Sequence, residues 1–282
     1  MVIPTLGGDS LSTTVAALNS GSLVPTEIIV CIPRNECTKI GEVRSSNTIV
    51  LPTDCQGQVA QRACGFKVAR SKYVMQLDDD ILVDKYCVQQ LSELIRGFAG
   101  KVAVAPSLLD SSTGESVFRR PTRRSLTRRI YYWLLNGHEG YQPGRIYQSG
   151  SGDGLDPTGS DKRAYEVEWL AGGCVLHQRE NLVLDDFYPF KGKAYCEDFI
   201  HSHLLRSKGV RLFVDANSTC YVDVLSYLSQ DFVPFLKNLV HDYRARIYFM
   251  KLRSRKSIRV YFFYLAMVAN YLANRLSSVI GR

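Results

Sequence analysis

Three consecutive aspartates, Asp78, Asp79 and Asp80, are the residues whose types and spacing most directly suggest chemistry. They follow residues 73–77, a short β-favouring apolar run that predicts a buried strand. The strand would carry the acids to its C-terminal end, where open α/β sheets bind ligands. Carboxylates crowded there repel each other unless a cation holds them, and Asp78 with Asp80 could hold Mg²⁺ or Mn²⁺. The alternative is a solvated acidic turn that caps a helix beginning near Asp84.

Predicted strands and helices alternate along the chain on both sides of these aspartates. Apolar, β-favouring runs predict strands at residues 2–3, 28–32, 48–51, 73–77, 102–105, 166–171, 174–177 and 211–214. Apolar periodicity and polar starts predict helices at residues 9–19, 56–69, 85–98 and 197–208. This alternation predicts an α/β fold, a Rossmann-like, doubly wound and mostly parallel sheet flanked by helices.

The composition is that of a globular protein with one large domain or slightly more. The chain has 282 residues, of which 45% are hydrophobic and 22% charged, which excludes a disordered chain. Its eight cysteines form no Cys-x-x-Cys pair, and scattered cysteines of this kind are typical of a reducing compartment. The first residues lack the basic and then apolar pattern of a signal peptide. We therefore expect a cytoplasmic location.

The net charge of +8 is concentrated near the C-terminus. Residues 233–282 contain ten Lys or Arg and one acid, Asp242, whereas residues 1–232 contain 25 basic and 26 acidic residues. An aromatic, apolar stretch at residues 260–269 follows the basic segment and is too short to span a membrane. This basic, aromatic helical tail is suited to an anionic membrane surface. The alternative is a helical pair that packs on the catalytic domain or forms a homodimer.

Several short motifs occur in an order that resembles a known enzyme family. They are Pro4-Thr5 after the first strand, Glu27-Ile28-Ile29-Val30, Arg62-x-x-Gly65, Leu77-Asp78-x-Asp80, Gly172-Gly173 and Glu197-Asp198. Over roughly residues 1–222 the chain resembles the family 2 glycosyltransferases, which are inverting, sugar-nucleotide-dependent enzymes with the GT-A fold. The resemblance implies a GT-A domain at residues 1–232 and leaves the tail at 233–282 outside it.

The resemblance also implies roles for individual residues. Those that match the nucleotide-sugar site are Pro4, Thr5, Arg62, Asp78 and Asp79, and those that match the Mn²⁺ or Mg²⁺ site are Asp78 and Asp80. Asp198 matches the catalytic base. The residues that match the acceptor side are Trp169, Gly172, Gly173 and Glu197.

The chemistry of sugar transfer independently requires these parts. Displacement of a nucleoside diphosphate from an anomeric carbon builds negative charge on the leaving phosphate, which a metal at Asp78 and Asp80 would stabilise. The acceptor hydroxyl loses its proton as it attacks from the opposite face, and a carboxylate such as Asp198 can take that proton. Glu197 could orient this base or simply cap its helix.

Two positions depart from the family pattern. Many members carry an aspartate that reads uracil after the second strand, whereas this chain has Cys31-Ile32-Pro33-Arg34. A UDP-type donor is therefore a default expectation. Many members also carry a metal-binding histidine after the last core strand, where this chain has Asp223, which could be an oxygen ligand or a surface acid.

These observations predict an inverting, metal-dependent glycosyltransferase, peripheral on the cytoplasmic face of a membrane. We expect its acceptor to be a lipid-linked saccharide in surface polysaccharide synthesis, because of the tail. No nucleic-acid-binding module accompanies the basic residues, so nucleic acid is not an expected partner. One alternative is a sugar nucleotidyltransferase, although the loop Pro4-Thr5-Leu6-Gly7-Gly8 lacks the basic residue such enzymes need. The other is a catalytically silent, membrane-bound scaffold of a glycan assembly complex.

Overall fold

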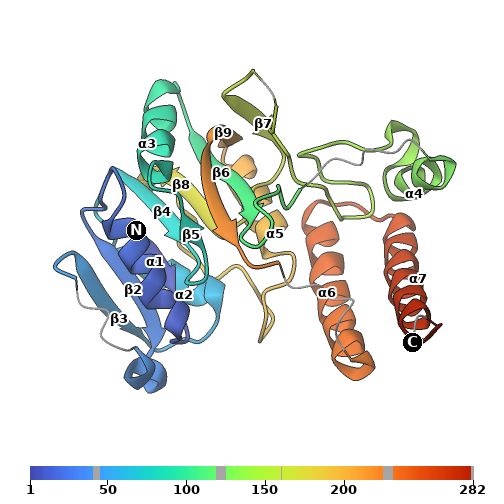
Figure 1. The fold of residues 1–282 in the computed structure, drawn as a ribbon, viewed down its shortest axis with the longest axis horizontal. Coiled ribbons are helices and arrows are strands. Elements are labelled where there is room, and N and C mark those ends of the chain that lie inside the picture. The colour runs from blue at the N-terminus through green and yellow to red at the C-terminus, as the bar shows by residue number, and fades with distance from the viewer. Residues whose placement is uncertain (41–44, 119–124, 160, 225–230, 281–282) are drawn as a thin grey trace.

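The computed structural model describes residues 1–40, 45–118, 125–159, 161–224 and 231–280, and its centre is a single twisted sheet (Figure 1). The strands are β1 Val2–Pro4, β2 Ile28–Pro33, β3 Thr48–Thr53, β4 Tyr73–Leu77, β5 Leu82–Val83, β6 Val102–Asp110, β7 Ala164–Val167, β8 Cys174–Gln178 and β9 Arg211–Val222. The α-helices are α1 Asp9–Asn19, α2 Gln58–Val68, α3 Cys87–Gly97, α4 Leu126–Asn136, α5 Glu197–Ser207, α6 Phe232–Leu252 and α7 Arg259–Ile280. Three short 3₁₀ helices connect them, η1 Arg34–Lys39, η2 Gly137–Glu139 and η3 Arg179–Asn181.

The strands of the sheet lie in the order β3-β2-β1-β4-β8-β6-β9-β5. The additional strand β7 pairs with the first half of β9, whereas β5 pairs with the second half. β1, β2, β3 and β4 are parallel to one another. β8 is antiparallel to both β4 and β6, so β6 and its parallel neighbour β9 run in the same direction as β4. The predicted α/β fold with a mostly parallel sheet flanked by helices is confirmed.

Helices cover both faces of the sheet because successive side chains of each strand point to opposite sides. On one face Ile3 and Met75 pack in a cluster with Leu11 of α1 and Leu91 of α3. On the other face Val2 and Val74 pack with Phe66 of α2, and the inward side of α5 covers the neighbouring strands. The two layers hold the C-terminal ends of β1 and β4 next to each other, where the predicted site residues lie.

Gly65 allows α2 to lie directly on the sheet. A Cβ atom at this position would lie 2.6 Å from Cys31 Sγ and would also collide with Val2. Real Cβ atoms do not approach other heavy atoms so closely, so a larger residue would push the helix away from the strands. The Arg62-x-x-Gly65 motif therefore places the arginine, one helical turn earlier, against the end of the sheet.

One predicted strand is wrong at four of its six residues. Residues 166–171 were expected to be extended in the sheet, but β7 ends at Val167 and residues 168–173 are irregular. Their backbone groups pair with α5 instead, because Leu170 N donates to Ser202 Oγ at 3.1 Å and Gly172 N donates to Asp198 Oδ1 at 2.9 Å. The segment therefore connects the sheet to the helix that carries the predicted base.

The C-terminal segment forms two long helices beside the sheet (Figure 1). α6 packs on α5, where the rings of Phe199 and Phe249 are stacked with centroids 5.7 Å apart. α7 contacts α4 through Arg259, which donates to the backbone oxygens of Trp133 and Leu134. Across the ranges that the structure describes, no helix combines the length and apolar character needed to cross a membrane.

Candidate active site

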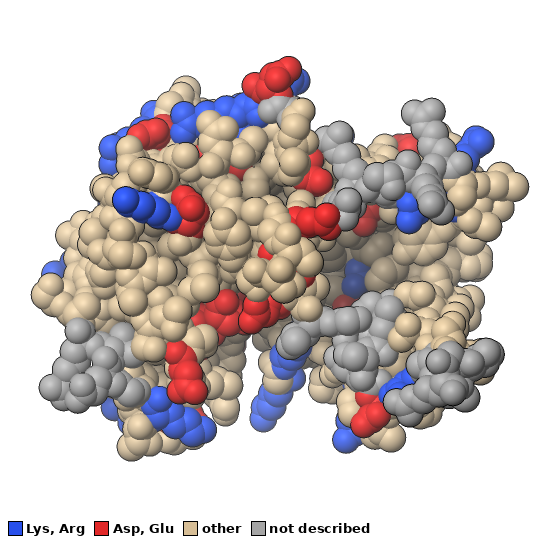
Figure 2. Space-filling view, in the orientation of Figure 1, with Lys and Arg blue, Asp and Glu red and all other residues tan. Residues whose placement is uncertain are grey.

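The carboxyl ends of β1 and β4 open into a cleft of about 980 Å³. β1 and β4 are parallel neighbours, with Val2 opposite Gln76, so the residues that follow both strands meet at one edge of the sheet. In the view of Figure 2, acidic side chains gather near the middle of the molecular surface, and basic side chains lie beside them. The residues that line the cleft are Pro4, Thr5, Leu6, Gly7, Gln56, Gly57, Gln58, Gln61, Asp78, Asp79, Asp80, Lys191, Gly192, Lys193 and Ala194.

The three aspartates of the cleft have different environments. Asp79 accepts a hydrogen bond from the Thr5 hydroxyl, which fixes it against the loop after β1. Asp78 Oδ1 accepts from Gln58 Nε2 at 2.7 Å and from Arg62 Nη2 at 3.0 Å. Asp80 is exposed and has no hydrogen bond or ion pair with any residue in the described ranges. Asp80 is therefore the carboxylate of this group that is most available to a ligand.

Arg62 connects the acidic cleft to the predicted catalytic base. Its side chain is only 3% exposed and forms ion pairs with Asp78 at one end and with Glu197 at the other. Burial raises the pKa of Asp78 to about 6, because desolvation outweighs the opposing attraction of Arg62. A buried guanidinium between two carboxylates stabilises all three groups only while every member is present.

Buried Glu197 and half-buried Asp198 form a carboxyl pair at the first turn of α5. Burial and the negative charge of Glu197 raise the pKa of Asp198 well above its usual range. Burial likewise opposes ionisation of Glu197, but the charge of Arg62 and a hydrogen bond from Asp198 leave the pKa of Glu197 lowered. Of the two, Asp198 is therefore the carboxylate that takes up a proton first as the pH falls.

Gly172 and Gly173 allow the aspartates that follow β4 to lie close to the Glu197-Asp198 pair. A Cβ at Gly172 would lie 2.8 Å from Glu197 Oε2 and would collide with Asp198, so only glycine fits beside the pair. Gly173 accepts a hydrogen bond from Asp78 N at 2.8 Å, which joins the same turn to the end of β4. The Gly172-Gly173 turn therefore lies between the acidic cleft and the carboxyl pair.

Two of the predicted positions lie away from this constellation. Trp169 is 8% exposed and packs edge-on against Phe118 and Phe199, and its indole N–H donates to Asp153 O at 3.2 Å. It does not line the cleft. Asp223 accepts a hydrogen bond from the Ser111 hydroxyl and is also absent from the cleft lining.

Known structures resemble this chain in fold. The chain is similar to GalNAc-T7, solved with UDP, GalNAc and Mn²⁺, with a TM-score of 0.55 and 16% identity over 86% of this chain and 47% of that one. Residues 1–349 of S. aureus TarS match with a TM-score of 0.47 and 13% identity, over 86% of this chain and 64% of that one. No protein-family model and no curated protein matches the sequence.

The chain has a GT-A-type fold. It spans about half the length of GalNAc-T7.

Sequence reasoning missed several residues of the GT-A cleft. Gln58 bonds to Asp78, and Gln61 donates to the backbone oxygens of Thr5 and Cys31 at 2.7 and 2.8 Å, which ties the ends of β1 and β2 together. The segment Lys191-Gly192-Lys193 also lines the cleft. A glycine between two lysines was the pattern in the sequence that could have indicated this turn. Gly192 adopts a φ of +89°, a conformation that favours glycine.

The carboxylates of the cleft can contribute to a divalent metal site but do not complete one. Asp78 Oδ2 and Asp80 remain available, whereas Asp78 Oδ1 is used by Gln58 and Arg62. Within the described part of the chain, no three His, Cys, Asp or Glu side chains converge as a metal site does. Mg²⁺ and Mn²⁺ commonly take one or two carboxylates and fill their other positions with water and substrate phosphates. The two carboxylates therefore fit an ion that binds together with a diphosphate.

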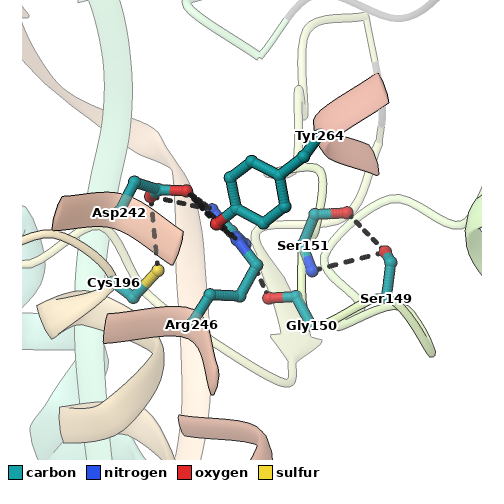
Figure 3. A network of polar contacts seen from close by, with 7 residues as sticks. All are labelled: Ser149, Gly150, Ser151, Cys196, Asp242, Arg246 and Tyr264. Atoms are coloured by element: carbon teal, nitrogen blue, oxygen red, sulfur yellow. Dashed lines mark hydrogen bonds and ion pairs between the residues drawn. The ribbon is translucent and has the colours of Figure 1, made fainter. Parts of the chain in front are cut away.

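A polar network joins the C-terminal helices to the start of α5 (Figure 3). Arg246 of α6 is buried and donates to both carboxylate oxygens of Asp242 at 3.0 Å and to the Gly150 oxygen at 2.8 Å. Tyr264 of α7 donates to Asp242 and accepts from Arg246. The Cys196 thiol donates to Asp242 at 3.5 Å.

Cys196 makes this network relevant to the site. It directly precedes Glu197 and Asp198 and has a φ of +56°, a left-handed conformation that is uncommon for residues other than glycine. Such a conformation persists only when surrounding contacts hold it. The bond to Asp242 is one of these contacts, so α6 positions the turn that presents the carboxyl pair.

We predict that Arg246→Met destabilises the fold by about 3 kcal/mol, because it leaves the mostly buried Asp242 carboxylate without its bidentate partner. Urea unfolding followed by circular dichroism measures this loss. Lys251→Met, on an exposed part of the same helix, is the matched control and should change stability by no more than about 0.5 kcal/mol. Equal stability of the two variants would show that the network does not hold α6 in place.

Proposed function

We propose that this chain is an inverting, metal-dependent glycosyltransferase of the family 2 type, which transfers a sugar from a nucleotide sugar to a saccharide acceptor. The observation that carries the proposal is the buried connection from Asp78 through Arg62 to Glu197 and Asp198, at the edge of a large acidic cleft. This arrangement supplies a site for a diphosphate with its cation and a protonatable carboxyl group beside it, which a single displacement at an anomeric carbon requires.

In this proposal the cleft binds the donor. Pro4, Thr5 and Asp79 form the wall along which the nucleoside lies, and Arg62 holds Asp78 from behind. Asp78 and Asp80 would hold Mn²⁺ or Mg²⁺, which stabilises negative charge on the departing diphosphate. A UDP-type donor fits the resemblance, and GalNAc-T7, which shares the fold, was solved with UDP and Mn²⁺.

Asp198 acts as the base in the proposed reaction. Gly172 N–H fixes one of its oxygens, and Glu197, held by Arg62, fixes its position from the other side. The acceptor hydroxyl gives its proton to Asp198 while its oxygen attacks the anomeric carbon opposite the leaving diphosphate, so the configuration inverts. The acceptor would lie along Gly172 and Gly173, whereas Trp169 is buried against Phe118 and Phe199.

One prediction of the proposed function concerns donor and metal binding. A nucleoside diphosphate with Mn²⁺ should raise the melting temperature of the wild type, since a ligand at a hundredfold excess over its Kd stabilises the fold by about 2.7 kcal/mol. Mn²⁺ alone should have little effect, because only two carboxylates are available to it. Asp80→Ala should abolish the metal-dependent part of the shift.

A thermal-shift panel of nucleoside diphosphates and sugar nucleotides, with and without Mn²⁺, measures this. The matched control is Asp185→Ala, which removes an exposed aspartate outside the cleft and should behave as the wild type. Absence of any shift with every nucleotide would contradict the proposal and favour the alternative of a catalytically silent scaffold.

Another prediction concerns Asp198 as the catalytic base. Asp198→Asn should lower the transfer rate by about 10²–10⁴ with donor affinity unchanged, because it removes the proton acceptor and keeps the shape. Asp215→Asn changes a buried aspartate of β9 outside the cleft and serves as the control. A wild-type rate in Asp198→Asn would exclude this role.

The pH profile tests the carboxyl pair more directly. The pKa of Asp198 is raised, so the base is protonated and transfer is lost as the pH falls through that raised value. Glu197→Gln removes the neighbouring negative charge and should move the acidic limb of the rate profile to lower pH. An unchanged limb would show that Glu197 does not set the proton affinity of Asp198.

The nucleotidyltransferase alternative differs in its product. That reaction releases pyrophosphate, whereas glycosyl transfer releases a nucleoside diphosphate. The loop of residues 5–8 carries no basic side chain to hold a triphosphate, which favours glycosyl transfer.

We further propose that residues 233–282 form a tail that attaches a GT-A domain of residues 1–232 to the cytoplasmic face of a membrane. A lipid-linked acceptor in surface polysaccharide synthesis would be reached there. Apolar side chains of the tail are exposed, namely Ile258, Tyr261, Leu265, Leu272 and Leu276. Fewer basic residues are available than the sequence suggested, because Arg246, Arg259 and Arg275 bond to protein groups.

Flotation with anionic liposomes tests the tail. The triple variant Lys251→Gln, Arg255→Gln, Lys256→Gln removes three exposed charges and should weaken binding by about 3 kcal/mol, at about 1 kcal/mol for each charge. The control triple Lys67→Gln, Lys101→Gln, Lys162→Gln removes the same charge from residues 1–232. Equal flotation of both triples would contradict a tail-directed attachment and leave the homodimer as the role of the exposed apolar residues.

A further inference from the structure

A second pocket adjoins the acidic cleft and has the opposite charge. It has a volume of about 230 Å³, lies between α6 and the segment that precedes α5, and is lined by Tyr188, Phe190, Lys191, Lys193, His241 and Arg244. No Asp or Glu side chain is part of its lining. Lys191 and Lys193 also line the acidic cleft, so one short segment of backbone separates the two spaces. We call this space the basic pocket.

Helical geometry explains why the cations of the basic pocket lack counter-ions. His241 and Arg244 lie three residues apart on α6 and share one face of the helix. Asp242, the only acid of α6, is turned to another face, where Arg246, Tyr264 and Cys196 bond to it. Lys191 and Arg244 have no ion pair or hydrogen bond with any residue of the described ranges. Their charges are therefore free for a ligand.

Aromatic rings give the basic pocket a fixed apolar wall. Phe190 packs edge-on against Tyr188 and against Tyr248 of α6, with ring centroids 5.5 and 5.7 Å apart. Tyr188 is only 7% exposed, so this wall is part of the packed interior. Lys193 lies over the ring of Tyr195 at 5.5 Å, which directs the stem of the lysine along the same segment. The cations thus surround a wall that can contact the organic part of a ligand.

We propose that the basic pocket binds the phosphate of the acceptor substrate. This inference rests on the proposed glycosyltransferase function and adds that the acceptor is a phosphate ester. Three cations, one imidazole and two aromatic rings suit an oxyanion attached to an apolar or sugar group. The acidic cleft repels a second anion once its own diphosphate is bound, whereas the neighbouring basic pocket attracts one.

The position of the basic pocket agrees with this role. Tyr188 to Lys193 lie just before the turn that carries Glu197 and Asp198. Burial raises the pKa of Tyr188, and Glu197 is close enough for its negative charge to raise that pKa further, so a phosphate held in the pocket lies near the carboxyl pair. The donor diphosphate occupies the other side of the same segment, with Asp78 and Asp80. Lys191 and Lys193 then separate two phosphate groups and partly neutralise both.

His241 and Arg244 allow the basic pocket to be tested apart from the donor site, because they do not line the acidic cleft. Isothermal titration calorimetry is carried out on the full chain with saturating Mg²⁺ and the nucleoside diphosphate that gives the largest thermal shift. Geranyl phosphate and inorganic phosphate are then titrated separately into this complex.

Geranyl phosphate should bind while the donor cleft is filled, and more tightly than inorganic phosphate because of the aromatic wall. The double variant His241→Gln, Arg244→Gln should weaken it about tenfold, the effect of losing charge-assisted hydrogen bonds. The affinity for the nucleoside diphosphate should stay unchanged. Lys237→Gln, which removes an exposed charge of α6 outside the pocket, should leave both affinities unchanged.

Other results would overturn the inference. Equal affinity for inorganic phosphate and geranyl phosphate would mean that the pocket holds free phosphate rather than an acceptor ester. A parallel loss of nucleoside diphosphate affinity in the double variant would assign the pocket to the donor. Failure of every nucleotide to bind the wild type would instead refute the proposed function, and the phosphate titrations without nucleotide would still report on the basic pocket.

Discussion

The buried guanidinium of Arg62 is the interaction on which the site depends. Without it, Asp78 and Glu197 would be two carboxylates in a desolvated space, and both would bind protons. With it, the pKa of Glu197 is lowered, whereas burial and the charge of Glu197 raise the pKa of Asp198. Arg62 reaches both acids only because Gly65 lets α2 lie directly on β1 and β2. A packing constraint on the face of the sheet thereby influences the proton affinity of residues that lie at its edge.

The local patterns of the sequence were sufficient to predict the parallel half of the sheet. The apolar runs of β1, β2 and β4 form strands that are buried on both faces, as continuous apolar runs typically are, whereas β3 lies at the edge of the sheet with Ile49 and Val50 exposed. The segment around Trp169 was less predictable, because its apolar residues indicate a strand while its backbone groups bond to Ser202 and Asp198 of α5. Those partners lie about thirty residues later in the chain, so no local sequence pattern predicts the contact.

The residues of the candidate site were likewise predictable only in part. The aspartates that follow β4 and the Glu197-Asp198 pair were predictable, since their types and spacing match a chemical requirement and a known family. Lys191 and Lys193 were not, because two lysines around a glycine are typical of any exposed turn. The tail shows the same limit, since counting its charges could not distinguish Arg246, buried against Asp242, from Arg244, two residues earlier and free.

Arg244 and Arg246 also show how one helix can serve two purposes. Residues 242 and 246 face the body of the protein and hold Cys196, which starts the helix of the carboxyl pair. Residues 241 and 244 face the basic pocket. The basic pocket and the turn that presents the carboxyl pair therefore share one helix, with the pocket on one face of α6 and the contact to Cys196 on another. Residues three and four apart on a helix are neighbours, so Arg244 can serve the pocket only because Arg246 already neutralises Asp242.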